Sequence, residues 1–445
     1  MQKVYFIGIG GIGISAVARY YKQNGWQVFG SDKYDSELIS TLKSEGMNII
    51  VGEDLERISK EIDLVIFTEA VPNTQTEIIK ARGLGIKTIS YPESLALISN
   101  DKKLIAISGS HGKSTTTSMI SIMLKNSSSG VNAVIGTILK EFDNKNAYFS
   151  SSEYFVIEAC EYKRSFLNYS PYIGIITNID LDHLDYYHDL TDYESAFNDF
   201  ISNIKSGGYA ILNASCISSM KFYGLRNDIS YILINENDFL FLDVNGNKEI
   251  TKFPKFALQV PGDHIKFDAK IAYVVGIILN LNSKEIINSL ENYTGVWRRS
   301  EIVGTTINGN ILMSDYGHHP TEIRLTLDAI KEKYSDKKLF IVFQPHQYNR
   351  TLNLIDGFVK CFESADKLVI PNIYESRDTW EDKNKLDTNM LVELINHPNK
   401  SDGLGLENTL KLIQEYDIEN PNSSIILLQG AGNVDNLRYE IGLIK

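Results

Sequence analysis

The stretch KLIAISGSHGKSTTT, residues 103–117, joins an apolar run to a glycine-rich turn and to the first turn of a polar helix pattern. The apolar part, Lys103–Ser108, predicts a buried strand, and the segment that follows Lys113 predicts a helix. Turns of this kind cradle phosphates with backbone N–H groups, while the lysine reaches the terminal phosphates and the next hydroxyl binds Mg²⁺. A full version of the motif has glycine at position 107, where this chain has Ile107. We therefore predict a shorter variant of a phosphate loop, formed by Gly109, Ser110, His111, Gly112, Lys113, Ser114 and Thr115.

Downstream of this loop, two more predicted strands end in polar side chains. The first, Tyr154–Glu158, ends in a carboxylate, and the second, Ile173–Thr177, is followed by Asp182 and His183. The carboxyl ends of parallel strands meet at one edge of a sheet, the same edge that carries the phosphate loop. A histidine alone can be an ordinary surface or packing residue, but beside Asp182 after an apolar strand it favours a metal site next to the phosphates.

Upstream, the first 100 residues repeat the strand-and-helix alternation. Strands are predicted at Val4–Ile9, Gln27–Phe29, Asn48–Val51, Leu64–Phe67 and Lys87–Ile89, and the spacing of Ile14, Val17, Ala18 and Tyr21 predicts a helix. The loop Gly8–Gly13 between the first strand and this helix has the glycine spacing of a diphosphate-binding turn, and Asp32 follows the second strand. This pattern leaves three possibilities open: a turn without a ligand, a nicotinamide dinucleotide site and a UDP-sugar site.

A third series of strands and helices begins with a hairpin, in which Glu301–Ile307 and Ile311–Met313 flank an Asn-Gly turn. Strands at Leu339–Phe343, Lys367–Ile370 and Ser424–Leu428 follow, and the polar segment Asp378–Lys385 is predicted to be a surface loop. Alternation of strands and helices favours parallel, doubly wound α/β sheets. We divide the 445 residues into three predicted domains, at 1–100, 101–294 and 295–445.

The composition limits the kinds of partner and the cellular compartment that we expect for this chain. A formal net charge of −12 disfavours a nucleic-acid surface, which needs clustered lysine and arginine. The three cysteines (Cys160, Cys216 and Cys361) are scattered and lack metal-site spacing, so we expect reduced thiols. The chain opens directly on a strand pattern, without a signal peptide, and lacks an apolar run long enough for a membrane helix. We expect a cytoplasmic protein without membrane insertion.

Taken together, these motifs resemble the Mur ligase family. The order of the glycine-rich loop, the Gly-Lys-Ser loop, the strand-end Glu158 and the Asn-x-x-x-Asp-His-x-Asp segment at 178–185 is characteristic of that family. The most specific segments are DYGHHPTE at 315–322 and FQPHQYNRT at 343–351, and the match runs from residue 3 to about 435. Within the family, the chain is most similar to the members that add L-alanine.

The resemblance implies an α/β fold of three domains: a Rossmann-like UDP-binding domain, a central P-loop ATPase-like domain and a C-terminal Rossmann-like domain. It implies an ATP- and Mg²⁺-dependent ligase that joins L-alanine to the lactyl carboxylate of UDP-N-acetylmuramate through an acyl phosphate, in peptidoglycan precursor synthesis. The chain is expected to be a monomer or a homodimer. The implied UDP-sugar site consists of Gly10, Gly11, Ile12, Gly13, Asp32 and His318. The implied ATP site consists of the phosphate loop Gly109–Thr115 with Arg299 and Asp315, and the implied metal ligands are Ser114, Glu158 and His183. The implied catalytic residues are Lys113, His346 and Arg350.

Three departures from the family pattern affect these expectations. The usual His-Asn-x-x-Asn near adenine reads His264-Ile265-Lys266-Phe267-Asp268, so we expect loose selection of the base. Cys160 replaces an aspartate in the loop after Glu158, and Asn198 stands where some relatives have a carbamylated lysine.

Three rival functions remain open at this level. The nearest is a ligase that recycles a preformed peptide onto the same UDP-sugar. A nicotinamide-dependent dehydrogenase would explain the first loop and Asp32 but leaves Lys113, Glu158 and His183 unexplained. A non-catalytic nucleotide-binding regulator would fit the altered adenine motif, but the same three residues argue against a loss of chemistry.

Overall fold

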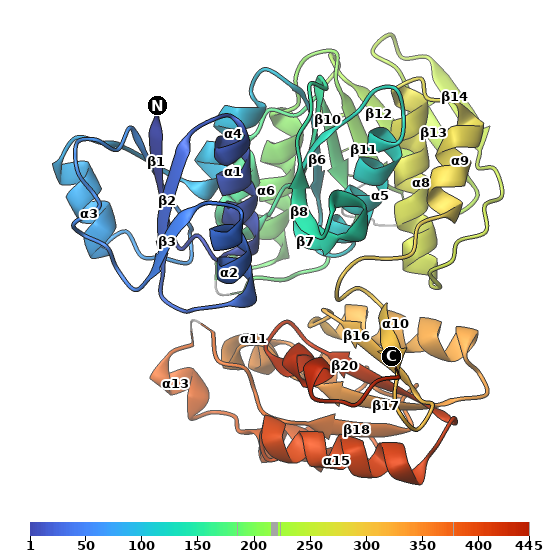
Figure 1. Cartoon of the computed structure of the whole chain (residues 1–445). Helices are drawn as coiled ribbons and strands as arrows, with labels where there is room; N and C mark the ends of the chain where they lie inside the picture. Colours follow the sequence, from blue (N-terminus) through green and yellow to red (C-terminus); the bar gives the residue numbers. More distant parts are fainter. Residues whose placement is uncertain (185, 215–220, 223, 377, 445) are drawn as a thin grey trace. The chain divides into compact units, whose positions relative to one another are not determined.

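The computed structural model describes residues 1–184, 186–214, 221–222, 224–376 and 378–444 (Figure 1). Asp185, the last residue of one predicted motif, and Cys216 lie outside the described residues. The chain divides into two compact units. The first comprises residues 1–180, 194–255 and 270–289, and the second comprises residues 181–193, 256–269 and 290–445.

The first unit begins with a parallel five-stranded sheet in the order β3-β2-β1-β4-β5. Its strands are β1 (Lys3–Ile7), β2 (Gln27–Asp32), β3 (Asn48–Val51), β4 (Leu64–Phe67) and β5 (Lys87–Ser90), and its helices are α1 (Ile12–Gln23), α2 (Glu37–Ser44), α3 (Thr76–Gly83) and α4 (Tyr91–Ser99). The apolar positions that predicted α1, namely Ile14, Val17, Ala18 and Tyr21, are all buried. The predicted strand Val4–Ile9 ends earlier, at Ile7, because Gly8 takes a φ of 76° and turns the chain.

A nine-stranded sheet completes the first unit, in the order β14-β13-β12-β11-β10-β6-β9-β7-β8. The central strands run parallel, so the carboxyl ends of β6, β9 and β10 lie at one edge. The strands are β6 (Lys103–Ser108), β7 (Asn132–Leu139), β8 (Lys145–Tyr148), β9 (Tyr154–Glu158), β10 (Ile173–Ile176), β11 (Tyr209–Asn213), β12 (Ser230–Ile234), β13 (Asp238–Leu242) and β14 (Lys248–Lys252). The accompanying helices are α5 (Lys113–Lys125), α6 (Leu190–Ser202), α8 (Asp263–Ile278), α9 (Ser283–Glu291), η1 (Lys140–Phe142) and η2 (Tyr162–Asn168), of which α6 and α8 extend into stretches assigned to the second unit.

The second unit contains a six-stranded sheet in the order β15-β16-β20-β17-β18-β19. The predicted hairpin is confirmed, because β15 and β16 pair antiparallel, with one irregularity between Ile302 and Gly304. The strands are β15 (Glu301–Thr305), β16 (Ile311–Asp315), β17 (Lys338–Phe343), β18 (Lys367–Ile370), β19 (Lys400–Asp402) and β20 (Ser424–Gln429). The helices are α10 (Pro320–Lys333), α11 (Tyr348–Asn353), α12 (Ile355–Phe358), α13 (Trp380–Lys383), α14 (Thr388–Leu394), α15 (Leu406–Glu419) and η3 (Val434–Tyr439).

The α/β fold class is confirmed, but one local prediction was wrong. The segment Asp378–Lys385, predicted to be a surface loop, contains the short helix α13. Thr379 accepts a hydrogen bond from the backbone N–H of Asp382, and the Asp382 carboxylate accepts one in return from the backbone N–H of Thr379. This reciprocal capping stabilises a helix start in a segment whose composition alone resembles a loop.

No helix among the described residues combines the length and apolar character that crossing a membrane requires.

Candidate active site

The loop between β6 and α5 has the backbone conformation that its glycines predict. Gly109 has a φ of 129° and Gly112 a φ of 80°, both in the region that favours glycine. A Cβ atom on Gly109 would collide with the side chain of Thr177 at the end of β10. Position 109 therefore requires glycine for two reasons: the turn itself and the close approach of a neighbouring strand end.

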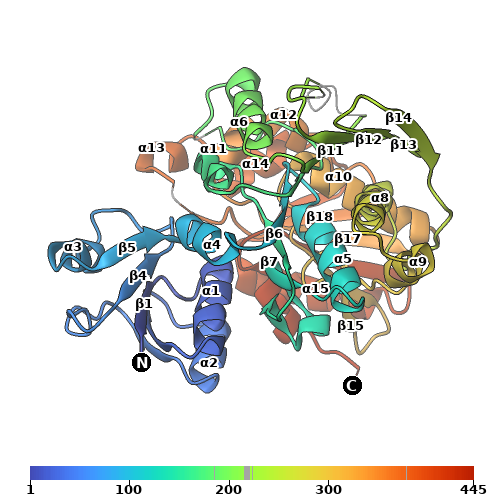
Figure 2. The ribbon, with the colours of Figure 1, turned by 90° about the horizontal axis from the view of Figure 1, so that it is seen from above.

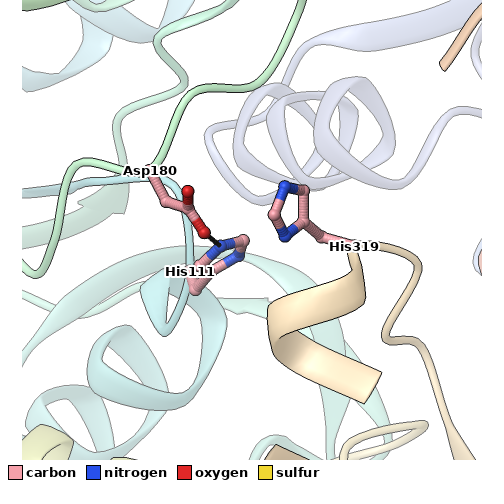
Figure 3. A group of neighbouring side chains, drawn as sticks. All are labelled: His111, Asp180 and His319. Atoms are coloured by element: carbon pink, nitrogen blue, oxygen red, sulfur yellow. Dashed lines mark hydrogen bonds and ion pairs between the residues drawn. The ribbon is translucent and has the colours of Figure 1, made fainter. Parts of the chain in front are cut away.

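The same loop is joined to the segment after β10 by reciprocal hydrogen bonds. The Ser110 hydroxyl donates to the Asp180 carbonyl at 2.6 Å and accepts from the Asp180 N–H at 2.9 Å. The His111 N–H donates to Asn178 Oδ1 at 2.9 Å, and Asn178 Nδ2 donates back to the His111 carbonyl at 3.0 Å. The His111 ring also lies 3.0 Å from Asp180 Oδ2, the contact drawn in Figure 3. These contacts hold the phosphate loop in one conformation.

Lys113 points back onto its own loop. Its Nζ donates to the carbonyls of Gly109 and Ser110 and to Glu161 Oε1, the last two at 3.1 Å. Burial is the largest single influence and would lower the pKa of Lys113, but Glu161, Cys160 and Glu158 together raise it, so the lysine is charged. The loop thus presents a cation beside backbone donors, which suits a terminal phosphate.

Next to the lysine, two oxygen ligands suited to Mg²⁺ lie together. Ser114 Oγ is 3.1 Å from Glu158 Oε2 at the end of β9. Glu158 Oε1 accepts a hydrogen bond of 2.6 Å from the backbone N–H of Gly136 in β7. A Cβ atom at position 136 would lie 2.8 Å from the same carboxylate, so only glycine allows this approach. A hydroxyl and a carboxylate beside a phosphate loop form the donor set that Mg²⁺ prefers, and these residues fit that ion.

The first glycine loop is built differently. The Gly10 N–H donates to Asp32 Oδ2 at 2.8 Å, so Asp32 of β2 holds the turn. Gly11 caps α1, which starts at Ile12, and a Cβ atom on Gly13 would meet the ring of Tyr91 at 2.7 Å. The loop therefore ends at a helix N-terminus, where an anionic diphosphate is favoured.

In the second unit, Arg350 and His183 line one pocket of about 230 Å³. Asp182 forms hydrogen bonds with both residues. Arg350 Nε donates to Asp182 Oδ1 at 3.3 Å, and the backbone N–H of His183 donates to the same oxygen at 2.7 Å. Burial would raise the pKa of Asp182, but His183 and Arg350 hold it well below its usual range. The pocket is mostly polar, and its wall consists of Asp182, His183, Leu184, Gln347, Asn349, Arg350, Asn353, Leu354, Asp378, Thr379 and Asp382.

Two more predicted histidines lie near this arginine. Burial and the charge of Arg350 lower the pKa of His318 to about 3, so its ring is neutral at physiological pH. The centroids of His318 and His346 are 6.3 Å apart, and His346 stacks on Tyr374 at 5.4 Å. The structure brings His318, His346 and Arg350 together, although His318 was assigned to the UDP-sugar and the other two to catalysis.

Arg299 and Asp315 both contact the segment that leads into α10, at Tyr316 and Gly317 respectively. Arg299 is 3.7 Å from Glu322, and the Asp315 carboxylate is 4% exposed. Asp315 accepts from the N–H groups of Ser300 at 2.8 Å and Gly317 at 2.7 Å, and from the Gln429 amide at 3.0 Å. These hydrogen bonds show that Asp315 stabilises the local backbone conformation. Its predicted contact with the ribose of ATP stays a prediction.

The altered adenine motif opens α8. Ile265 is 5% and Asp268 is 4% exposed, and burial lowers the pKa of His264. Neither residue that replaces the family's asparagines presents an exposed amide.

Sequence reasoning missed several residues of the site. Asn178 belongs to a predicted motif but received no role of its own, and no role was predicted for Glu161 or Asp180. Gly136 lies in β7, a strand that was not predicted from the sequence, and a glycine inside a strand often marks the close approach of another group.

Comparisons with known proteins agree with this geometry. Three family models match the chain: the Mur ligase family, catalytic domain, at residues 3–103; the Mur ligase middle domain at 107–272; and the Mur ligase, glutamate ligase domain, at 298–432.

Among curated relatives, UDP-N-acetylmuramate–L-alanine ligase of Clostridium botulinum (strain Hall) is 38% identical over 458 residues, covering 99% of this chain and 96% of the relative. The enzyme with the same name from Clostridium acetobutylicum is 38% identical over 447 residues, covering 97% and 96%. Among solved structures, UDP-N-acetylmuramate-alanine ligase from Thermotoga maritima matches with a TM-score of 0.80 at 25% identity, covering 99% and 98% of the two chains. A murein peptide ligase from Psychrobacter arcticus matches with a TM-score of 0.71 at 20% identity, covering 99% and 98%, and shares the fold.

Proposed function

The chain belongs to the Mur ligase family, and we propose that it joins L-alanine to the lactyl carboxylate of UDP-N-acetylmuramate at the expense of ATP, in peptidoglycan precursor synthesis. The observation that carries this proposal is the grouping of Lys113, Ser114 and Glu158 at the phosphate loop of a chain 38% identical to ligases of that name. A dehydrogenase or a non-catalytic regulator would not need this set.

We assign the residues as follows. The loop Gly10–Gly13, with Asp32 and His318, would hold the UDP-sugar. The loop Gly109–Thr115, with Arg299 and Asp315, would hold ATP, and Lys113 would contact its β- and γ-phosphates. Ser114, Glu158 and His183 would hold Mg²⁺, which neutralises phosphate charge when bound. Three domains at 1–100, 101–294 and 295–445 would carry these parts.

The first chemical step activates the carboxylate. One lactyl carboxylate oxygen attacks the γ-phosphorus, the bond from that phosphorus to the β-phosphate oxygen breaks, and ADP leaves. The product is an acyl phosphate. Charge builds on the transferred phosphoryl group, and the partly buried, charged Lys113 with Arg299 offers fixed cations against it.

The second step forms the amide. The amine of L-alanine attacks the acyl carbon, and inorganic phosphate leaves. The amine must lose a proton to attack, and we propose His346 as the group that accepts it. Arg350, which lines the pocket that also contains His183, would hold the carboxylate of L-alanine.

We propose that the enzyme acts in the cytoplasm. Cys160 and Cys361 are both free thiols, and thiols stay reduced in that compartment.

An assay of phosphate release tests the proposal. Purified protein should release phosphate from ATP only when Mg²⁺, UDP-N-acetylmuramate and L-alanine are all present, with one amide product formed per phosphate. Phosphate release that requires a preformed peptide in place of L-alanine would instead identify a recycling ligase. Hydride transfer to a nicotinamide, or nucleotide binding without turnover, would overturn the proposal.

A further inference from the structure

The antiparallel strands β7 and β8 form a hairpin that reaches from the ATP-binding sheet to helix α1. β7 pairs with β9 inside the sheet, β8 is the outer strand, and both contact α1 (Figures 1 and 2). α1 begins at the loop that we assign to the diphosphate of the UDP-sugar. The hairpin therefore lies between the two nucleotide sites of the first unit.

One fully buried side chain makes the polar contacts between this hairpin and the start of α1. Asn146 of β8 is 0% exposed. Its Nδ2 donates to the Ile12 carbonyl and, at 2.9 Å, to Ser15 Oγ in the first turn of α1. Its Oδ1 accepts from Nη1 of Arg19, whose Nε and Nη2 donate to Glu45, each with a bond of 2.9 Å. Donors and acceptor of the amide are all engaged, so its orientation is fixed.

The other strand of the hairpin reaches the ATP site. The backbone N–H of Gly136 in β7 holds Glu158 at 2.6 Å, and Glu158 is 3.1 Å from the hydroxyl of Ser114. One rigid element thus touches the first turn of the diphosphate helix with one strand and the carboxylate of the phosphate-transfer site with the other.

We propose that Asn146 is a positioning residue, which fixes the diphosphate helix α1 against the ATP-binding sheet and so sets where the lactyl carboxylate meets the γ-phosphate. This inference rests on the proposed function. Attack on phosphorus needs the reacting atoms within about 3–3.5 Å, and a misplacement of about 1 Å can lower a rate by roughly a hundredfold. An apolar side chain would serve for packing alone, whereas a buried amide is retained only when its directional bonds are made.

The sharpest test is Asn146→Asp, which keeps the acceptor for Arg19 and the shape of the side chain. It loses the two donated hydrogens and sets a carboxylate oxygen against the Ile12 carbonyl. Because each ligand still has its own loop, we expect kcat to fall by roughly tenfold to a hundredfold while the Kd values for UDP-N-acetylmuramate and ATP stay within about threefold. We also expect faster hydrogen exchange of the amides in the first turns of α1.

Two further variants complete the experiment. Ser15→Ala removes one of the two acceptors on the α1 side and should lower kcat by about threefold to tenfold with unchanged affinities. Gln23→Ala is the matched control, since Gln23 Nε2 donates to the carbonyl of Phe149, the residue after β8, at 3.2 Å and so contacts the end of the hairpin from the other end of α1. We expect wild-type kcat and wild-type affinities for that control.

The possible results separate the two proposals. An inactive wild-type protein refutes the ligase function, and hydrogen exchange in α1 then decides the role of Asn146 by itself. If the wild type is active, an unchanged kcat in Asn146→Asp, or a loss of UDP-sugar affinity as large as the loss of kcat, overturns the positioning role. If Asn146→Asp does not fold, Ser15→Ala carries the same decision: an unchanged kcat overturns the proposal, and a lower kcat at unchanged affinities supports it.

Discussion

The two glycine loops of the first unit are alike in sequence position and different in what surrounds them. Each follows a strand that has parallel neighbours on both sides, β1 or β6, and opens a helix, α1 in one case and α5 in the other. At the first loop, Asp32 holds the backbone N–H of Gly10. At the second, Lys113 and Ser114 meet carboxylates supplied by later parts of the chain.

This difference shows what a loop needs for phosphoryl transfer beyond what it needs to bind a nucleotide. A glycine turn at a helix N-terminus provides backbone donors and a favourable dipole, which are enough to bind a diphosphate. Phosphoryl transfer also needs a fixed cation and oxygen ligands for a metal ion. The second loop obtains these from neighbouring strand ends, and the following predictions test whether the two loops divide the work in this way.

The largest effect is expected for Lys113→Ala. Loss of the cation that neutralises the transferred phosphate should lower the ligation rate by about a thousandfold or more. The affinity for UDP-N-acetylmuramate, measured by calorimetry, should stay near the wild-type value because that ligand uses the first loop. Lys125→Ala, at the other end of α5, is the control and should retain activity. An equal loss of UDP-sugar affinity in Lys113→Ala would break the distinction between the loops.

A smaller but large effect is expected for Gly136→Ala. The added methyl group would lie 2.8 Å from Glu158 Oε2 and 3.0 Å from Oε1, so the carboxylate must leave its present position beside the phosphate loop. We expect kcat to fall by roughly a hundredfold and the Mg²⁺ concentration for half-maximal activity to rise. Gly83→Ala is a suitable control, since a methyl group there meets nothing within 4 Å. A normal Mg²⁺ requirement in Gly136→Ala would remove Glu158 from the metal site.

The third prediction concerns the first loop alone. Asp32→Asn weakens the charged acceptor of the Gly10 N–H, and we expect the Kd for UDP-N-acetylmuramate to rise about tenfold, which corresponds to about 1.4 kcal/mol. The Kd for ATP should not change. Asp35→Asn, in the same connection but bonded only to the neighbouring Ser36 N–H in the described contacts, serves as control. Calorimetric titration of both ligands into both variants distinguishes a loop-specific effect from a general loss of folded protein.

The smallest effect is expected for the choice of base, because we assign neither loop a contact with it. Ile265 and Asp268 are buried and carry no amide, so base recognition would depend on backbone groups and stacking. Comparison of ATP with GTP as phosphate donor should give a preference below about a hundredfold, or about 2.7 kcal/mol. A stronger preference for ATP would mean that other side chains read the base.

The parts of the molecule that sequence could predict are those determined by neighbours in the chain. The two strand–turn–helix loops, the hairpin at β15–β16 and the apolar stripe of α1 all follow from local periodicity and turn chemistry. The capping of α13 by Thr379 was also local, but the polar composition of that segment obscured it. Local signals are therefore reliable for elements and less so for short helices.

The long-range contacts around the two loops were not predictable from local sequence patterns. Gly136 is 22 residues from Glu158, and Asn146 is 131 residues from Ser15. Their proximity depends on strand order and on how the hairpin lies against α1, which no single segment encodes. Asn146 in particular lies in a stretch with no motif, and only its complete burial and its hydrogen bonds distinguish it.

The bonds between the second loop and the end of β10 have a thermodynamic consequence for ligand binding. Ser110 and His111 are already bonded to Asp180 and Asn178, so the loop loses little further freedom when a nucleotide arrives. Preorganisation of this kind reduces the ordering penalty of association. Nucleotide binding at this loop should accordingly carry a small entropic penalty from ordering of the chain, with a heat-capacity change no larger than the buried surface of the nucleotide itself requires.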